Sequence, residues 1–239
     1  MTNWGVMIAR GNLHLTKKAV STFLAQDIGD TALFFIDNDS PDGTSQWLRS
    51  IPDERMYRVT FKRQKSVSEC WNYALQWIFS QNGEYALVLN NDVELRPETY
   101  RLLVEDGGDF VTAVGVNARE QMTEAVLEPQ KRRNHPDFSA YLIRKKVFDQ
   151  VQFDEAYKGG YVEDAQFHLD MFRAGIPAYC IGVPFYHVAS GTMKSATPSE
   201  QKRIAEQAEK NRELFYKRHG ARVGTPEYYA LFENGMIPA

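Results

Sequence analysis

The first half of the chain alternates between short apolar runs and longer segments of helical periodicity. Apolar runs predict strands at 6–9, 32–36, 57–61 and 86–89. Between them, apolar spacing predicts helices over 13–25, from Thr44 onward, and from a cap at Ser66 or Ser68 to about Phe79. This alternation predicts a parallel sheet whose strands are joined by helical crossovers.

The run Ala86–Leu89 ends abruptly in Asn90-Asn91-Asp92. The following Arg96-Pro97-Glu98 is typical of a helix start, with Pro near the first turn. Ligands bind at the carboxyl ends of strands in open α/β sheets, and a carboxylate there suits Mg²⁺ or Mn²⁺. Taken alone, the triplet is equally typical of a polar turn with a helix cap.

The second half has a different pattern. It predicts strands at 110–116, 138–143 and 177–181, and a short extended piece at 184–188. Helices are expected at 147–151, at 165–174 and at 198–219, and Gly175 directly follows the second of them as its C-terminal cap. We therefore divide one domain into a nucleotide-binding α/β half (1–100), a differently patterned second half (101–195) and a C-terminal helical tail (196–239).

Composition narrows the class of protein further. The chain has 239 residues with a net charge of −3, which gives no global reason to expect a nucleic-acid or membrane partner. Cys70 and Cys180 are far apart and share no motif, so we expect a reduced compartment and no metal–thiolate site. We find no targeting segment and no membrane span, and we expect a cytoplasmic protein.

The usual nucleotide-binding fingerprints are missing from the first half. Neither G-x-G-x-x-G after the first strand nor G-x-x-x-x-G-K-[ST] occurs, which disfavours a dinucleotide oxidoreductase or a P-loop enzyme. Asp37 instead follows the second strand, where its carboxylate could accept hydrogen bonds from a ribose or a base. Asp39 and Asp42 are more typical of turn residues, with Gly43 supplying a permissive backbone.

Six segments, in order, resemble the inverting glycosyltransferases of family 2, which have the GT-A fold. They span roughly residues 4 to 220, and Ser66 stands where the family usually has Gly. The matching segments are Ile36–Thr44, Ser66–Asn72, Leu89–Glu94, the region from Phe138 to Asp164, His187 to Thr192, and Asn211–Gly220.

The resemblance implies a fold and a reaction. The fold is α/β of GT-A type, a Rossmann-like, mainly parallel sheet flanked by helices, with an acceptor-side second half and a C-terminal helix. The reaction moves a sugar from a nucleotide-diphosphate sugar, most simply a UDP-sugar, to a carbohydrate or other hydroxyl acceptor. Its cofactor would be Mn²⁺ or Mg²⁺.

The resemblance also implies roles for particular residues. Asp92 and His187 would hold the metal, and a single carboxylate in the triplet predicts weak or exchangeable binding. Asp164 would be the general base, with Glu163 beside it facing the acceptor. The donor would be bound by Ala9, Arg10, Asp37, Asn72 and Asn91.

Each of these assignments has a plainer alternative. A lone His is often a half-buried residue bonded to a carbonyl, and Asp164 with Glu163 could simply cap a helix. Two basic runs, 131–133 and 144–146, flank the predicted acceptor side. They are typical of solvated surface, although a polyanionic or nucleic-acid acceptor would also explain them. A sugar nucleotidyltransferase and a non-catalytic carbohydrate- or nucleotide-binding GT-A domain remain alternatives for the whole chain.

Overall fold

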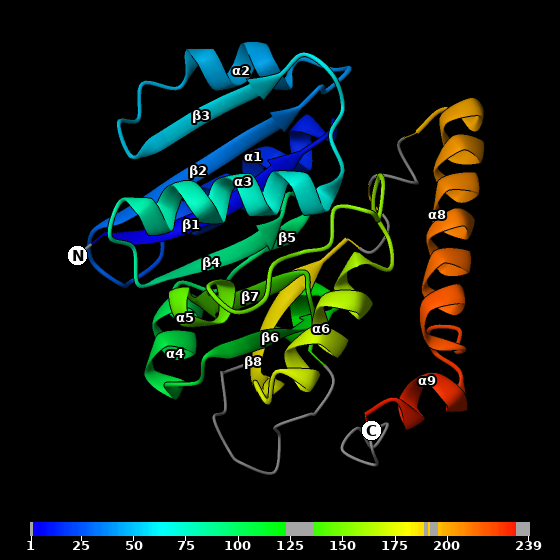
Figure 1. The fold of residues 1–239 in the computed structure, drawn as a ribbon. Helices are drawn as coiled ribbons and strands as arrows, with labels where there is room; N and C mark the ends of the chain where they lie inside the picture. The colour runs from blue at the N-terminus through cyan, green and yellow to red at the C-terminus, as the bar shows by residue number, and fades with distance from the viewer. Residues whose placement is uncertain (1, 123–135, 189–190, 192–195, 233–239) are drawn as a thin grey trace.

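A computed structural model describes residues 2–122, 136–188, 191 and 196–232. Its centre is a mixed eight-stranded sheet with the strand order β3-β2-β1-β4-β7-β6-β8-β5 (Figure 1). The strands are β1 (Asn3–Ala9), β2 (Thr31–Asn38), β3 (Met56–Phe61), β4 (Tyr85–Asn90), β5 (Val93–Glu94), β6 (Phe110–Val116), β7 (Ala140–Arg144) and β8 (Ala178–His187). The predicted α/β class with a GT-A-type sheet is confirmed.

The strands of the first half are parallel, as their sequence pattern predicts. β1 pairs with β2 on one side and with β4 on the other, and β3 adds to β2. β1, β2 and β4 are buried on both faces, which explains their unbroken apolar runs, whereas β3 is a largely exposed edge strand. Their carboxyl ends therefore lie along one edge, where Ala9, Asn38 and Asn90 end their strands.

The second half adds antiparallel pairing to the sheet. β7 runs antiparallel to both β4 and β6, and β8 runs parallel to β6. The two extended pieces expected at 177–181 and 184–188 form one strand, β8. The reason is that β6 pairs with both pieces. An irregularity between Thr112 and Val114 shifts the register, so that the pairing continues on the other side of Gly182.

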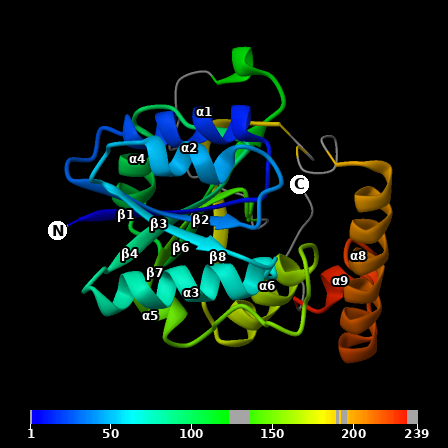
Figure 2. The ribbon, with the colours of Figure 1, turned by 90° about the horizontal axis from the view of Figure 1, so that it is seen from above.

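Helices cover both faces of the sheet (Figure 2). α1, α2 and α4 lie on one side, and α3, α5 and α6 on the other. Alternate strand residues pack against these two layers, so Phe35 and Phe34 belong to different core clusters. The helix bounds are α1 (Leu13–Leu24), α2 (Thr44–Ser50), α3 (Val67–Ser80), α4 (Thr99–Asp106), α5 (Lys145–Phe148), α6 (Glu163–Arg173), α8 (Pro198–His219) and α9 (Pro226–Ala230), with a 3₁₀ turn at Arg119–Gln121.

Two helix starts illustrate how local sequence acts. Ser66 caps α3: its Oγ accepts a hydrogen bond from Glu69 N at 3.2 Å, while Ser66 N donates to Glu69 Oε2 at 2.9 Å. α4 begins at Thr99 rather than at Arg96. Residues 96–98 form a turn instead, closed by a hydrogen bond from Thr99 N to Arg96 O at 3.1 Å.

The C-terminal helices form a small third layer beside the sheet. α8 stands at the side toward which the parallel strands point (Figure 1). Phe215 of α8 belongs to one apolar cluster with Val162, which precedes α6, with Leu169 of α6 and with Tyr228 of α9. Among the residues that the structure describes, no helix combines the length and hydropathy that crossing a bilayer requires.

Candidate active site

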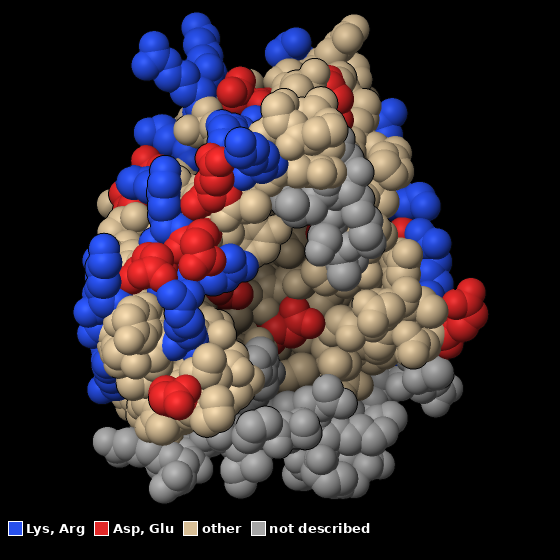
Figure 3. Space-filling view, turned by 90° about the vertical axis from the view of Figure 1, so that its right-hand side faces the viewer, with Lys and Arg blue, Asp and Glu red and all other residues tan. Residues whose placement is uncertain are grey.

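A cleft of about 1040 Å³ opens at the carboxyl edge of the parallel strands. Figure 3 shows it as a hollow with acidic side chains inside. The strand ends, the loop before α6 and one side of α8 contribute to its walls. Its polar and charged lining includes Arg10, Asn38, Lys65, Ser66, Asn90, Asn91, Asp92, Ser139, Lys158, Tyr161, Glu163, Asp164, His187 and Arg203.

Asp92 and His187 lie together at one end of this cleft. The Nε2 atom of His187 is 3.3 Å from Oδ1 of Asp92. Asp92 directly precedes β5, and His187 ends β8, whose antiparallel register pairs His187 with Val93. This short pairing is what joins residues so far apart in sequence.

The surroundings of Asp92 suit a divalent cation. A carboxylate and an imidazole form a ligand pair that Mn²⁺ accepts. Gly191 N lies 3.3 Å from Asp92 Oδ2, and a Cβ added at Gly191 would approach that oxygen to 2.7 Å, so glycine leaves the carboxylate room. Within the described ranges, no three His, Cys, Asp or Glu side chains form a metal-holding group. A cation here would therefore need further ligands from substrate or water.

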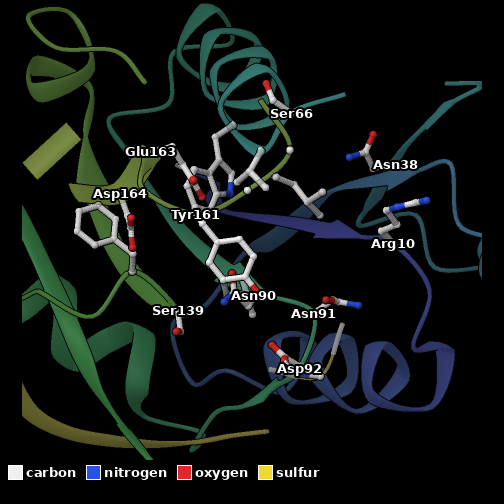
Figure 4. Close-up of a pocket in the computed structure, with 18 of the residues that line it drawn as sticks. Arg10, Asn38, Ser66, Asn90, Asn91, Asp92, Ser139, Tyr161, Glu163 and Asp164 are labelled. Atoms are coloured by element: carbon white, nitrogen blue, oxygen red, sulfur yellow. Dashed lines mark hydrogen bonds between the residues drawn. The ribbon is translucent and has the colours of Figure 1, made fainter. Parts of the chain in front are cut away.

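Glu163 and Asp164 open helix α6 on the opposite wall (Figure 4). The helix cap is Val162, so Asp164 is the second residue of the helix and not its N-cap. Asp164 Oδ1 accepts a hydrogen bond from Ala165 N at 2.8 Å. The positive end of the helix dipole favours an ionised carboxylate at this position.

Glu163 is buried, whereas Asp164 is half-buried. Burial, with a smaller effect from the neighbouring Asp164 charge, raises the pKa of Glu163 from 4.5 to about 8. Its Oε2 atom has no hydrogen-bond partner within the described part of the chain. Burial thus disfavours a negative charge on Glu163 beside the Asp164 carboxyl group.

Two of the expected donor-binding residues line the cleft. Arg10 donates from Nη1 to Asp39 O at 3.3 Å and lies 3.9 Å from Glu200 of α8. Asn91 donates from Nδ2 to Gly11 O at 3.1 Å and to Thr16 Oγ1 at 2.9 Å. Asn91 therefore holds the loop after β1 in place.

Ala9, Asp37 and Asn72 do not belong to the cleft lining. Asp37 is fully buried and accepts hydrogen bonds from Ser40 N at 3.1 Å and from the Ser45 hydroxyl. Asn72 exchanges two hydrogen bonds with the backbone of Phe153, at 2.8 and 3.0 Å.

Sequence reasoning missed Asn38 and Tyr161. Asn38 follows Asp37 directly in β2 and so points the other way, into the cleft, where it exchanges hydrogen bonds with Lys65 N and O at 2.8 and 3.0 Å. The ring of Tyr161 projects into the cleft between Asn90 and the Glu163–Asp164 pair (Figure 4). An aromatic residue after Gly159-Gly160 was the available signal for Tyr161.

The basic run 144–146 lies away from the cleft. Arg144 pairs with Tyr85 at the start of β4, the edge opposite Asn90. Lys145 pairs with Asp149 at 2.6 Å and Lys146 with Asp109 at 2.8 Å. This run does not line the cleft, and its contact with an acceptor stays a prediction. The run 131–133 lies outside the described residues.

Comparison with known proteins gives the class of the chain. The family model described as glycosyl transferase family 2 matches residues 6–161, and the chain belongs to this family. It is a glycosyltransferase. The match ends just before Glu163 and Asp164, so it carries no information on these two residues or on His187.

Solved structures show the same fold at low identity. S. aureus TarS (residues 1–349) matches with a TM-score of 0.59 at 14% identity, over 98% of this chain and 78% of that chain. The mannosyltransferase PcManGT from Pyrobaculum calidifontis, in complex with GDP-Man and Mn²⁺, matches with a TM-score of 0.57 at 14% identity, over 97% and 78%. TarS in complex with UDP-GlcNAc matches with a TM-score of 0.59 at 14% identity, over 97% and 79%. A longer TarS structure is covered to only 48%. No curated protein matches this chain.

Proposed function

We propose that this glycosyltransferase moves a sugar from a nucleoside-diphosphate sugar to an acceptor hydroxyl, with inversion at the anomeric carbon. The observation that carries this proposal is the shared cleft: Asp92, His187 and Asp164 all line it, at the edge of the sheet where α/β folds bind ligands. Family membership favours this reading over a sugar nucleotidyltransferase or a non-catalytic binding domain.

The donor would lie along the strand ends. Asn38 and Arg10 stand at the β1 and β2 end of the cleft, and Asp92 lies apart from them, beyond Asn91 (Figure 4). His187 lies beside Asp92. We place the nucleoside near Asn38 and the diphosphate near Asp92. TarS has been solved with UDP and UDP-GlcNAc, and PcManGT with GDP-Man, so both uridine and guanosine donors deserve a trial.

Asp92 and His187 are the residues that would hold Mn²⁺ or Mg²⁺. A bound cation would supply charge neutralisation for the departing diphosphate. The pair fits this role because it presents one hard oxygen and one imidazole nitrogen close together. Gly191 would keep the carboxylate accessible.

Asp164 would act as the general base. A carboxylate on the wall opposite Asp92 can take the proton from an acceptor hydroxyl while that oxygen attacks the anomeric carbon from the side away from the diphosphate. One Asp164 oxygen already accepts from Ala165 N, which fixes the orientation of the carboxylate. Its place at the start of α6 favours the ionised state that a base requires.

Glu163 would contribute as a neutral acid. A second ionised carboxylate beside Asp164 would be costly in this buried corner, and the raised pKa of Glu163 avoids that charge. A protonated Glu163 can donate a hydrogen bond to a sugar hydroxyl. It would then help to orient the acceptor, while Asp164 accepts the proton.

A donor screen tests the proposal. UDP-GlcNAc, UDP-glucose and GDP-mannose would each be tested with and without Mn²⁺, by thermal shift and by release of nucleoside diphosphate in the absence of acceptor. We expect at least one donor to raise the melting temperature and to be hydrolysed slowly in a Mn²⁺-dependent reaction. If none of an extended panel of nucleotide sugars binds or reacts, the proposal is wrong.

A further inference from the structure

Asn211, in the middle of α8, is almost completely buried. Its amide group makes hydrogen bonds to backbone groups rather than to a charged side chain. Its Nδ2 donates to three carbonyl oxygens, those of Lys158 at 2.9 Å, Gly160 at 3.1 Å and Tyr161 at 2.9 Å. Its Oδ1 accepts from Lys158 N at 3.3 Å. One amide group thus holds the whole segment that leads into Glu163 and Asp164.

This segment has a strained backbone. Tyr161 and Val162 are consecutive non-glycine residues with φ of 74° and 76°. A left-handed conformation is unfavourable for such residues, and it persists only where surrounding contacts hold it. Because these two residues directly precede α6, their conformation sets the direction in which the helix leaves the loop. It therefore sets where Glu163 and Asp164 point.

The same segment is held on its other side by the nucleotide half of the domain. Val67 N, at the start of α3, donates to Gly159 O at 2.7 Å. Val67 and Ser66 also line the cleft. The loop at 158–162 is thus clamped between α3 and α8, and Asn211 provides the α8 side of the clamp.

Packing keeps α8 at a fixed distance from this loop. Phe215, one turn beyond Asn211, is fully buried against Val162 and Leu169. Gln207, one turn before Asn211, donates to Asn211 Oδ1 at 3.1 Å and fixes the orientation of the amide. The amide and the apolar contacts therefore act on the same strained residues.

We propose that Asn211 is a positioning residue of this enzyme: by holding the carbonyls of Lys158, Gly160 and Tyr161, it aims Glu163 and Asp164 into the cleft. The proposal rests on the function proposed above. Asn211 itself touches no reacting atom in this scheme. Its removal should therefore weaken turnover and leave donor binding, which we assign to the opposite wall, unchanged.

Asn211→Asp is the sharpest test because it keeps the shape of the side chain and loses both amide hydrogens. The carboxylate would face three carbonyl oxygens that it cannot bond. Asn211→Ala is the companion variant without added charge. Thr197→Ala is the matched control, since it removes the N-cap of the same helix without touching the loop.

Donor hydrolysis in the presence of Mn²⁺ provides the first readout. We expect kcat to fall about 10²-fold in both Asn211 variants, with donor KM unchanged, because small misplacements of catalytic groups have effects of this size. Amide hydrogen exchange of residues 159–164 provides the second readout, and should accelerate in the Asn211 variants and not in Thr197→Ala.

The outcomes separate this inference from the proposed function. Unchanged kcat in Asn211→Asp, or an equal fall in Thr197→Ala, overturns the positioning role alone. Unchanged exchange at residues 159–164 in both Asn211 variants also overturns it. If the wild-type chain hydrolyses no nucleotide sugar, the proposed function falls and the positioning role falls with it.

Discussion

His187 Nε2 lies 3.3 Å from Asp92 Oδ1, although 94 residues lie between Asp92 and His187 in the chain. The two side chains meet because β5 and β8 pair across the end of the sheet. Neither residue is fully buried, and both line the cleft. This relationship is the basis of the first prediction.

Removing either member of the pair should abolish or weaken the rise in melting temperature that Mn²⁺ causes. In the wild type, Mn²⁺ in excess should raise the melting temperature, because a ligand at about 100 times its Kd stabilises a fold by about 2.7 kcal/mol. Asp92→Ala should lose this shift completely, and His187→Ala should lose most of it. Differential scanning fluorimetry with Mn²⁺ and with EDTA measures the effect.

Glu94→Gln is the control for this experiment. Glu94 lies in β5 beside the pair, but its partners are Arg119 and Lys18 and it does not line the cleft. This variant should keep the Mn²⁺ shift. A shift that survives in Asp92→Ala would show that the cation binds elsewhere.

Asp164→Asn should keep the fold and the donor affinity while losing turnover. The substitution preserves the hydrogen bond from Ala165 N and removes only the basic oxygen. General base catalysis contributes about 10²–10⁴-fold, so kcat for transfer should fall within that range. Steady-state kinetics measures kcat, and titration with the donor measures affinity. Transfer at the wild-type rate would exclude Asp164 as the base.

Glu163→Gln should flatten the pH dependence of stability. Since folding raises the pKa of Glu163 from 4.5 to about 8, its protonation stabilises the fold fully below 4.5. This contribution is lost progressively as pH rises to about 8 and is constant above that. Glutamine stays neutral throughout. Urea unfolding between about pH 5 and pH 9 should therefore show a smaller decline for Glu163→Gln than for the wild type.

The opposite result would contradict our account of this corner. If the wild type and Glu163→Gln decline in parallel, Glu163 is not a buried acid in the folded protein. Asp170→Asn provides a comparison on the same helix, because Asp170 does not line the cleft.

Ser66→Ala and Ser66→Gly should differ in stability. Ser66 Oγ caps α3, and replacement of a capping Ser by Ala costs about 1 kcal/mol, whereas Gly costs only a few tenths. Chemical denaturation should therefore rank the wild type above Ser66→Gly and Ser66→Gly above Ser66→Ala. Equal loss in both variants would mean that the capping box contributes little to α3.

Neutralising the basic run at 145–146 should leave the reaction unchanged. Lys145 and Lys146 make exposed ion pairs at the edge away from the cleft, and such pairs contribute about 0–1 kcal/mol. The double variant Lys145→Gln/Lys146→Gln should keep donor KM and kcat. A raised KM would show that substrate reaches this edge.

Much of the fold followed from the sequence because β1, β2 and β4 are buried on both faces. Such strands appear as unbroken apolar runs, and polar clusters mark their ends, as at Asp37 and Asn90. A cap at Ser66 or Ser68 was predictable from the sequence, and the structure places it at Ser66. The pairing partners of β7 and β8 were not, because register between distant strands depends on packing that no local pattern encodes.

The site was predicted in outline and not in detail. The resemblance to glycosyltransferase family 2 made Asp92, Glu163, Asp164 and His187 candidates, and the structure brings them to one cleft. The sequence could not decide which of Asp37 and Asn38 faces that cleft. Both are polar, and neighbouring strand residues point to opposite sides.

Asn211 begins a segment that resembles the family, but the sequence assigned it no role. Its contacts are with a loop some fifty residues away in the chain, as those to Lys158 and Tyr161 show. Only the packing of α8 against α6 reveals why an amide stands there.

The pairing of β5 with β8 sets a limit on how this enzyme can vary in length. Side chains alternate along β8, so inserting or deleting a single residue between Cys180 and His187 would turn the imidazole to the other side of the strand. Changes of two residues would restore the facing but move the ring past Asp92. Homologous chains that keep the His–Asp pair should therefore tolerate length changes in the segments before β8 and not within it.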